Sequence, residues 1–322
     1  MRSPFPYFGG KSPVASVIWQ ALDPDSQVYI EPFCGSAAVL LARPGGPSGI
    51  EIINDADGFV ANFWRAVAWD PDAVAYWATW PMSEVDLHAR TGWLLNRSER
   101  LKWLLEDPDF YDPKIAGWWL WGRCCSIARW LNGEGPWFST GVHLLNKNDV
   151  GKVDLPGFTR SKPCITRDMG IFRKTQAGQT RDEYIRQLMI ELHNRLKDVK
   201  ILCGDWKRAF VKCLLDQKTC AIFLDPPYSA NTGRDIGLYT AESTDVSAEV
   251  RRWAIEHGER ENIRVVLAGY EGEHDMPESW RVYKWAANGG YGNQRRNGDN
   301  MNKLKERLWF SPHCHHVDAN MF

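Results

Sequence analysis

VYIEPFCGSAAVLLAR, residues 28–43, is the stretch that decides the fold. Val28 to Phe33 is apolar and rich in strand-forming residues, Cys34-Gly35-Ser36 allows a tight turn, and the alanines and leucines that follow suit a short helix. A second strand pattern at residues 50–53 is followed by a helical pattern at residues 58–67. Strands that alternate with helices of this length indicate a parallel sheet, so the sequence predicts an α/β fold.

The middle of the chain has a different pattern. From about residue 71 to 200 the sequence is helical and rich in tryptophan, without a regular alternation of strands. Asp112-Pro113 predicts the start of a helix that ends near Asn132, and Thr180 to Glu183 has the form of a capping box that opens another. Strand patterns return at residues 200–206, 221–225, 263–270, 280–285 and 306–311. We therefore predict an α/β domain made of residues 1–70 and 200–322, interrupted by an insert at residues 71–199.

Seventeen tryptophans are an unusual number for a chain of 322 residues. Those at positions 64, 69, 77, 80 and 93 and in the segment WWLW (118–121) recur at helical spacings, which favours a role in the core. A minority of exposed aromatic side chains in the insert could still stack on nucleic acid bases or wedge between them.

The composition is that of an ordinary globular protein, and no apolar run is long enough to span a membrane. The N-terminus lacks the apolar core of a secretion signal, so we expect a cytoplasmic protein. Its eight cysteines are then reduced thiols, and no pair has the C-x-x-C spacing of a zinc site. The cluster from His313 to His316 could bind a metal adventitiously, but we interpret it as a polar tail and expect no metal.

The net charge of −1 hides an uneven distribution of charged residues. Residues 151–212 contain 14 Lys and Arg against 7 Asp and Glu, and residues 281–307 contain 7 against 2. Residues 1–70, by contrast, contain 4 Lys and Arg against 7 Asp and Glu. Two basic segments after an acidic one suit a protein that binds a polyanion on one face, although ordinary solvated faces explain the same numbers nearly as well.

Polar residues lie where the first two strands are expected to end. Glu31 follows the first strand and offers an acceptor for a cationic or hydroxyl group, and Asp55 follows the second and is placed to accept hydrogen bonds from a ribose. The turn after Glu31 lacks the G-x-G-x-x-G pattern of a dinucleotide site. Near the N-terminus, Phe8-Gly9-Gly10-Lys11 provides a flexible turn with one cation.

The segment AIFLDPPY, residues 221–228, ends a buried strand with an acid, two prolines and an aromatic residue. Proline cannot donate to a sheet, so the strand must stop there with a fixed backbone. The carboxylate of Asp225 and the carbonyl of Pro226 can then act as two acceptors at one point, an arrangement that suits an exocyclic amino group. Tyr228 offers a ring on which a planar base can stack. The alternative is a rigid strand terminator with a surface tyrosine.

Four motifs in this order give a resemblance to a known family. YFGGK (7–11), EPFCGSAA (31–38), NDAD (54–57) and DPPY (225–228) resemble the motifs of the Dam-like DNA adenine-N6 methyltransferases, in the alpha order and at similar spacing. The resemblance covers residues 1–67 and 198–310. It implies a Rossmann-like methyltransferase sheet, S-adenosylmethionine as the cofactor, and the insert as a mostly helical target-recognition domain.

The resemblance also implies a role for individual residues. The N-terminal motif would cover the methionine end of the cofactor, Glu31, Phe33 and Gly35 would belong to the cofactor loop, Asp55 would bind the ribose, and the segment CGDW (203–206) would hold the adenine. Tyr7 stands where the family commonly has tryptophan, and Ala37 or Ala38 replaces its usual second glycine. The implied cofactor-binding residues are Tyr7, Phe8, Gly10, Lys11, Glu31, Phe33, Gly35, Ser36, Asp55, Asp205, Trp206 and Asp225, and the implied catalytic residues are Asp225, Pro226 and Tyr228.

The mechanism that the resemblance implies starts with a flipped adenine, because the amino group is paired and unreachable inside a duplex. Its N6 would be oriented by Asp225 and the Pro226 carbonyl and would attack the methyl group in line, without a metal. The expected partner is double-stranded DNA in a bacterial cell or a phage-infected host. Candidate DNA-binding residues are Arg160, Arg167, Arg173, Lys174, Arg181, Arg295 and Arg296.

Other functions remain open at this point. An RNA adenine methyltransferase would have the same fold, although aspartate as the first residue of the DPPY motif favours adenine in DNA. A DNA-binding protein without activity, on a methyltransferase scaffold, would usually have lost Asp225 or Tyr228, and both are present. A nucleotide-dependent oxidoreductase would need the phosphate-binding glycine pattern that this chain lacks.

Overall fold

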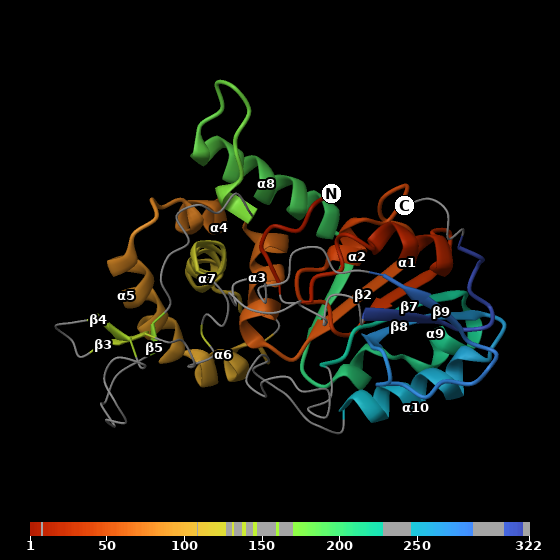
Figure 1. Cartoon of the computed structure of the whole chain (residues 1–322). Helices are drawn as coiled ribbons and strands as arrows, with labels where there is room; N and C mark the ends of the chain where they lie inside the picture. Colours follow the sequence, from red (N-terminus) through yellow and green to blue (C-terminus); the bar gives the residue numbers. More distant parts are fainter. Residues whose placement is uncertain are drawn as a thin grey trace.

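The computed structural model of the chain (Figure 1) describes residues 1–7, 9–107, 109–126, 131, 170–227, 246–285 and 306–317. It also describes the backbone of three short strands, β3 (Trp137–Ser139), β4 (Leu144–Asn146) and β5 (Thr159–Arg160), which pair as a small antiparallel sheet. A helical lobe that contains α3 to α8 lies on one side of Figure 1, and a larger sheet with its covering helices lies on the other.

The large sheet has seven strands in the order β6-β2-β1-β7-β8-β10-β9. The first five are parallel to one another, while β10 is antiparallel to both β8 and β9. This mixed and mostly parallel sheet confirms the predicted α/β fold and is consistent with a Rossmann-like methyltransferase. The strands are β1 (Val28–Glu31), β2 (Ile50–Asp55), β6 (Val199–Cys203), β7 (Cys220–Leu224), β8 (Ile263–Tyr270), β9 (Arg281–Lys284) and β10 (Glu306–Phe310).

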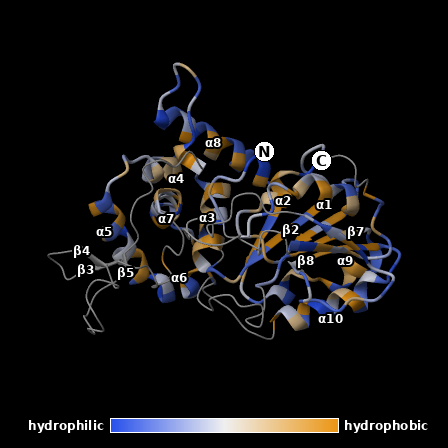
Figure 2. Ribbon diagram, viewed as in Figure 1, coloured by the Kyte–Doolittle hydropathy of each residue, from blue (hydrophilic) through white to orange (hydrophobic). Residues whose placement is uncertain are grey.

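Helices cover both faces of this sheet, so its central strands are apolar on both sides. In β7, Ala221 and Phe223 belong to the core on the α1 face, whereas Ile222 and Leu224 belong to the core beneath α10. Figure 2 shows the apolar residues concentrated along these strands and on the inward sides of the helices. The covering elements are α1 (Ala15–Leu22), α2 (Ala38–Leu41), α9 (Lys212–Gln217), α10 (Val246–Gly258) and the 3₁₀ turn η2 (Trp206–Ala209).

The helical lobe shares its core with the α1 face of the sheet. Trp119 of α7 packs against Phe5 and Phe63, with ring centroids 4.8 and 5.7 Å apart respectively. The same core includes Met189 and Leu192 of α8, both fully buried. The helices of the lobe are α3 (Gly58–Trp69), α4 (Pro71–Ala78), α5 (Glu84–Leu95), α6 (Ser98–Leu104), α7 (Pro113–Cys125), α8 (Arg181–Leu196) and the 3₁₀ turn η1 (Gly170–Phe172).

Local sequence signals account for the ends of these helices. The Asp112 side chain accepts a hydrogen bond from the Ile115 N–H at the start of α7, and Thr180 and Glu183 form the predicted capping box of α8. The prediction that α7 continues to about Asn132 is wrong. The helix ends at Cys125, because Ser126 has an extended backbone; its N–H and its hydroxyl both donate to the carbonyl of Gly122 in the last turn.

The tryptophans at helical spacings fall into three groups, of which one, Trp77, Trp93 and Trp118, is half-buried. Trp64, Trp119 and Trp121 are almost fully buried and confirm the predicted core role, whereas Trp69 and Trp80 are 69% and 52% exposed. Trp69 is the last residue of α3, and Trp80 follows the end of α4, so both rings lie at helix ends and at the surface. None of the helices in the described part of the chain combines the length and the apolar character that crossing a bilayer requires.

In the segment from His313 to His316, His315 and His316 are exposed, while the backbone is held against the rest of the fold. Cys314 is only 5% exposed, and the His315 N–H donates to the carbonyl of Ala21 at the end of α1. Arg281 of β9 donates to the carbonyls of Cys314 and His315. Across the described residues, no three His, Cys, Asp or Glu side chains are grouped as a metal site.

A buried ion cluster joins α8 to the sheet. Glu51 of β2 is 2% exposed and accepts hydrogen bonds from Arg43 Nη1 at 3.0 Å and from Arg195 Nη2 at 2.8 Å. Arg43 and Arg195 are themselves only 5% and 9% exposed. Removal of the carboxylate would therefore leave two buried guanidinium groups without their counter-ion.

We expect Glu51→Ala to lower the free energy of unfolding by about 3–5 kcal/mol, as measured by urea denaturation. Arg260→Ala, which breaks the exposed pair between Arg260 and Asp216, is the matched control and should change stability by about 1 kcal/mol or less. Equal effects of the two substitutions would contradict the structural role of the cluster.

Candidate active site

Four acids lie at the carboxyl ends of four adjacent strands. Asp205 follows β6, Asp55 ends β2, Glu31 ends β1, and Asp225 follows β7. Because these strands are parallel neighbours, their carboxyl ends meet at one edge of the sheet, where α/β proteins bind their ligands. The chain order also reverses there, since β1 has β2 on one side and β7 on the other. The fold therefore gathers the acids that the sequence singled out.

Glu31 is a buried carboxyl group at the centre of this edge. It is 2% exposed, and its Oε2 accepts hydrogen bonds from the Tyr29 hydroxyl at 2.8 Å and from the Leu40 N–H at 3.1 Å. Burial raises the pKa of Glu31 to about 8. Among the described residues no Lys or Arg forms an ion pair with it, so a cation that binds here would favour the charged carboxylate.

Asp55 shapes the turn that follows Glu31. Its Oδ2 accepts a hydrogen bond from the Gly35 N–H and its Oδ1 accepts one from the Asp57 N–H, both at 2.9 Å. Burial also raises the pKa of Asp55, to about 7. Gly35 has a φ of 43°, and a Cβ atom there would come within 2.5 Å of the Tyr7 ring. The turn thus requires glycine both for its backbone and for its contact with Tyr7.

Lys11 and Asp225 form an ion pair at the edge. Lys11 is 2% exposed, and its Nζ donates to Asp225 Oδ1 at 2.9 Å, to Asp225 Oδ2 at 2.7 Å and to the carbonyl of Gly9 at 2.7 Å. The carboxylate of Asp225 remains 20% exposed. Pro226, directly after it, is buried. Lys11, which was predicted to contact the cofactor, therefore binds the predicted catalytic acid Asp225 and fixes the orientation of its carboxylate.

Aromatic rings line the other end of the edge, next to Asp205. Phe33 and Trp206 stack with their centroids 6.1 Å apart and their planes 29° apart. Trp206 is 4% exposed, and its buried Nε1 has no hydrogen-bond acceptor among the described residues. Asp205 is exposed, and its Oδ1 accepts a hydrogen bond from the Lys207 N–H. A planar ligand with hydrogen-bond acceptors matches this arrangement.

The remaining predicted residues lie in different places. Gly10 closes the N-terminal turn with a hydrogen bond to the Tyr7 carbonyl, and the buried Ser36 hydroxyl lies 3.3 Å from that of Ser3. Arg181 is engaged within the protein, since it donates to the carbonyls of Ile171 and Arg173. Arg173 and Lys174 follow η1, and Lys174 is exposed. Outside the described residues are Phe8, Tyr228, Arg167, Arg295, Arg296 and the side chain of Arg160.

Two side chains that hold residues of the site in place, Tyr29 and Trp64, were not predicted from the sequence. The Tyr29 hydroxyl binds Glu31, and the Trp64 Nε1 donates to the carbonyl of Gly35 at 2.9 Å. Tyr29 lies two residues before Glu31 in the same strand, so strand periodicity places both side chains on one face. This spacing could have identified Tyr29, whereas nothing local links Trp64 to the turn.

Comparison with known proteins gives one family. Residues 7–102 match the family model described as D12 class N6 adenine-specific DNA methyltransferase. The match includes the N-terminal turn with Lys11, the turn with Glu31 and Gly35, and Asp55. No curated protein matches the chain.

The pKa of Glu31 predicts how stability depends on pH. Its pKa is about 8 in the folded protein against 4.5 for the ordinary group, so the folded state binds more protons between these values. Stability should therefore be greatest at the acid end of this window and fall as the pH rises towards 8, with a contribution from Glu31 approaching about 1.4 kcal/mol per pH unit. Asp55 acts in the same direction up to about pH 7.

Urea unfolding of the wild-type protein and of Glu31→Gln between pH 5 and pH 8 measures this effect. We expect the stability of the wild type, relative to the variant, to decrease steadily over the range, because glutamine does not titrate. A difference that stays constant with pH would show that Glu31 is not a buried, protonated group.

Proposed function

We propose that the chain is a D12 class N6 adenine-specific DNA methyltransferase, a family that uses S-adenosylmethionine and whose model matches residues 7–102, and that its catalytic centre is the sheet edge that carries Asp205, Asp55, Glu31 and Asp225. In this proposal Asp225 binds the amino group of an adenine flipped out of double-stranded DNA. The observation that carries the assignment is the buried Lys11–Asp225 pair, which holds a partly exposed carboxylate at the end of β7.

The residues at this edge fit the chemistry of S-adenosylmethionine, which supplies an electrophilic methyl group when bound. Glu31, a buried acid without an ion-pair partner among the described residues, suits the cationic methionine end. Asp55 can accept hydrogen bonds from ribose hydroxyls. The stacked rings of Phe33 and Trp206, and the buried Trp206 Nε1 that lacks an acceptor in the described part, suit the adenine.

Asp225 would work by position. Each carboxylate oxygen has two lone-pair directions, so the two hydrogen bonds from Lys11 leave room for an amino group to donate as well. An amino group that donates both protons, to Asp225 and to the Pro226 carbonyl, keeps its lone pair directed away from these acceptors. The nitrogen gains positive charge as it forms the new bond, and the nearby carboxylate stabilises that charge.

Lys11 would prepare this carboxylate. Its three hydrogen bonds prevent Asp225 from rotating, so the acceptor geometry exists before the substrate arrives. Lys11 therefore acts as a positioning residue in our proposal, whereas the sequence placed it on the cofactor. The proton that leaves the methylated amino group passes to water, since the Lys11 ammonium already donates to both oxygens of Asp225.

The helical insert, residues 71–199, is proposed as the target-recognition part. Its described helices pack on α3 and on the N-terminal segment, so their position relative to the sheet edge is fixed by a common core. Base flipping is part of this proposal, because only an extruded base brings its amino group to Asp225.

Asp225→Asn should lower kcat for methyl transfer by about 10²–10³-fold, because a neutral amide removes the negative charge beside the developing ammonium. Transfer of a labelled methyl group to duplex DNA, followed by nucleoside analysis for N6-methyladenine, measures this. Cofactor affinity, measured by calorimetry, should stay close to that of the wild type. Asp216→Asn, at an exposed aspartate of α9, is the control.

The same assay with tRNA and ribosomal RNA in place of DNA tests the proposed substrate. Preferential methylation of RNA by the wild-type protein would contradict double-stranded DNA as the partner, and an Asp225→Asn variant with normal kcat would contradict the catalytic role of Asp225.

Lys11→Gln separates the two roles considered for Lys11. If Lys11 positions Asp225, kcat should fall by about 10²-fold while the dissociation constant of S-adenosylmethionine changes little. If it binds the cofactor instead, the dissociation constant should rise and kcat at saturating cofactor should recover. Tyr29→Phe provides a comparison, since it removes a hydrogen bond to Glu31 and leaves the Lys11–Asp225 pair intact.

A further inference from the structure

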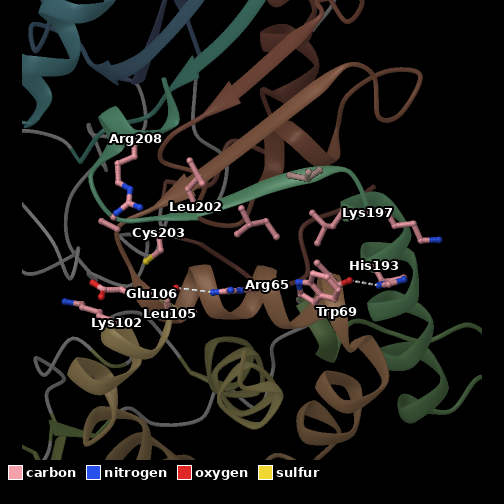
Figure 3. A pocket seen from close by; sticks show the side chains of 16 residues that line it. Arg65, Trp69, Lys102, Leu105, Glu106, His193, Lys197, Leu202, Cys203 and Arg208 are labelled. Carbon is pink, nitrogen blue, oxygen red and sulfur yellow. Dashed lines mark hydrogen bonds between the residues drawn. The ribbon is translucent and has the colours of Figure 1, made fainter. Parts of the chain in front are cut away.

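A groove of about 960 Å³ follows the outer side of β6, away from the rest of the sheet (Figure 3). Its walls come from α3, α6, α8 and η2. Leu105, Leu196, Val199 and Ile201 give it an apolar lining. β6 is the terminal strand of the large sheet, and no strand in the described part of the chain pairs with its outer edge. None of the residues assigned to the proposed catalytic centre lines this groove.

Basic side chains are in excess around the groove. Lys102, Lys197 and Arg208 are exposed, and Glu106 is the sole acidic residue among the described residues that line it. Lys102 has a weak contact with Glu99, at 3.8 Å and one helical turn away. Within the described residues neither Lys197 nor Arg208 has an ion-pair partner.

Two other basic residues of the groove have structural tasks. Arg65 donates to the carbonyls of Leu105 and Asp107 and so ties α3 to the end of α6. His193 Nδ1 lies 2.9 Å from the carbonyl of Ala68, which leaves its other ring nitrogen for a ligand. The dashed lines in Figure 3 mark such bonds. The cations available for an external anion are thus Lys102, Lys197 and Arg208, with His193 beside them.

The groove begins next to the proposed catalytic edge. Ala56 and Gly204, which line one end, directly follow Asp55 and precede Asp205 in the sequence. In Figure 3, Lys102 and Arg208 lie near this end and Lys197 and His193 near the other. The five residues of β6 separate the two ends by about 13 Å at 3.3 Å per residue. Successive nucleotides of one DNA strand rise about 3.4 Å, so this distance corresponds to about four of them.

We propose that this groove binds the sugar–phosphate backbone of DNA beside the target adenine, through Lys102, Arg208 and Lys197. This inference rests on the proposed function, because that function brings DNA to the adjoining edge. The chain as a whole has a net charge of −1, so a basic groove that continues from the active edge is a local feature and complements a polyanion. Trp69, 69% exposed, adds a ring face for a sugar or a base.

The double variant Lys102→Gln/Lys197→Gln tests the proposal. Arg208 is left unchanged because it is close in sequence to Trp206, which is proposed to contact the cofactor. Binding of a 30-base-pair DNA duplex is measured over a range of salt concentrations. Loss of two phosphate contacts should reduce the slope of log K against log salt by about 1.8. It should also raise KM for DNA, while kcat at saturating DNA and the dissociation constant of S-adenosylmethionine stay unchanged.

The control is Lys212→Gln/Lys218→Gln, which removes the same charge beside α9, and it should keep the wild-type slope. Thermal unfolding of both variants excludes loss of the fold as the cause. A second series uses duplexes shortened from both ends. The difference between wild type and the groove variant should disappear once the duplex is too short to reach the groove.

A groove variant with the wild-type salt slope, or a control with the same decrease, would overturn the proposal. A wild-type protein that binds DNA without methylating adenine would instead overturn the proposed function, and the comparison of salt slopes would still decide whether DNA lies in the groove. The two failures are therefore distinguishable.

Discussion

The ion pair between Lys11 and Asp225 is the interaction on which the site depends. It joins a turn near the N-terminus to the end of β7, 214 residues later. An ammonium group with 2% exposure is costly unless it is paired and fully hydrogen-bonded, so the Asp225 carboxylate stabilises the position of Lys11 at the sheet edge. The same pair orients the carboxylate that we assign to the amino group. Stability and function therefore share one contact.

The other acids at the edge follow a different principle. Glu31 and Asp55 are held where burial disfavours their charge, with pKa values of about 8 and 7. Neighbouring N–H and hydroxyl donors offset only part of this cost. A cationic or hydroxyl-bearing ligand would relieve this cost, so the burial of these carboxyl groups favours binding of such a ligand. Perturbed carboxyl groups of this kind are typical of functional sites.

Local patterns in the sequence predicted much of this arrangement, but not its long-range pairings. The strand that stops at Asp225-Pro226 and the glycine turn at Gly35 are readable, because each depends on the conformations that a few consecutive residues allow. The partner of Lys11 is not readable from the chain, since the contact exists only after β1 and β7 have paired. The predicted end of α7 and the predicted burial of two tryptophans were wrong for a similar reason. α7 ends at Cys125, before Ser126, and Trp69 and Trp80 are exposed although their spacing is that of core residues.

The shared core of the helical lobe and the sheet has a consequence for DNA binding. Phe63 of α3, Leu101 of α6 and Met189 of α8 belong to one buried cluster, and Val199 and Ile201 of β6 pack against it, so these helices cannot shift easily against β6. The walls of the basic groove are therefore set before DNA arrives, and binding there does not require the ordering of α3, α6 and α8. The preformed basic groove beside the active edge would hold the duplex while an adenine leaves the DNA helix, because contacts to the sugar–phosphate backbone position DNA without depending on its sequence. Selection of the target is then left to side chains that reach the bases.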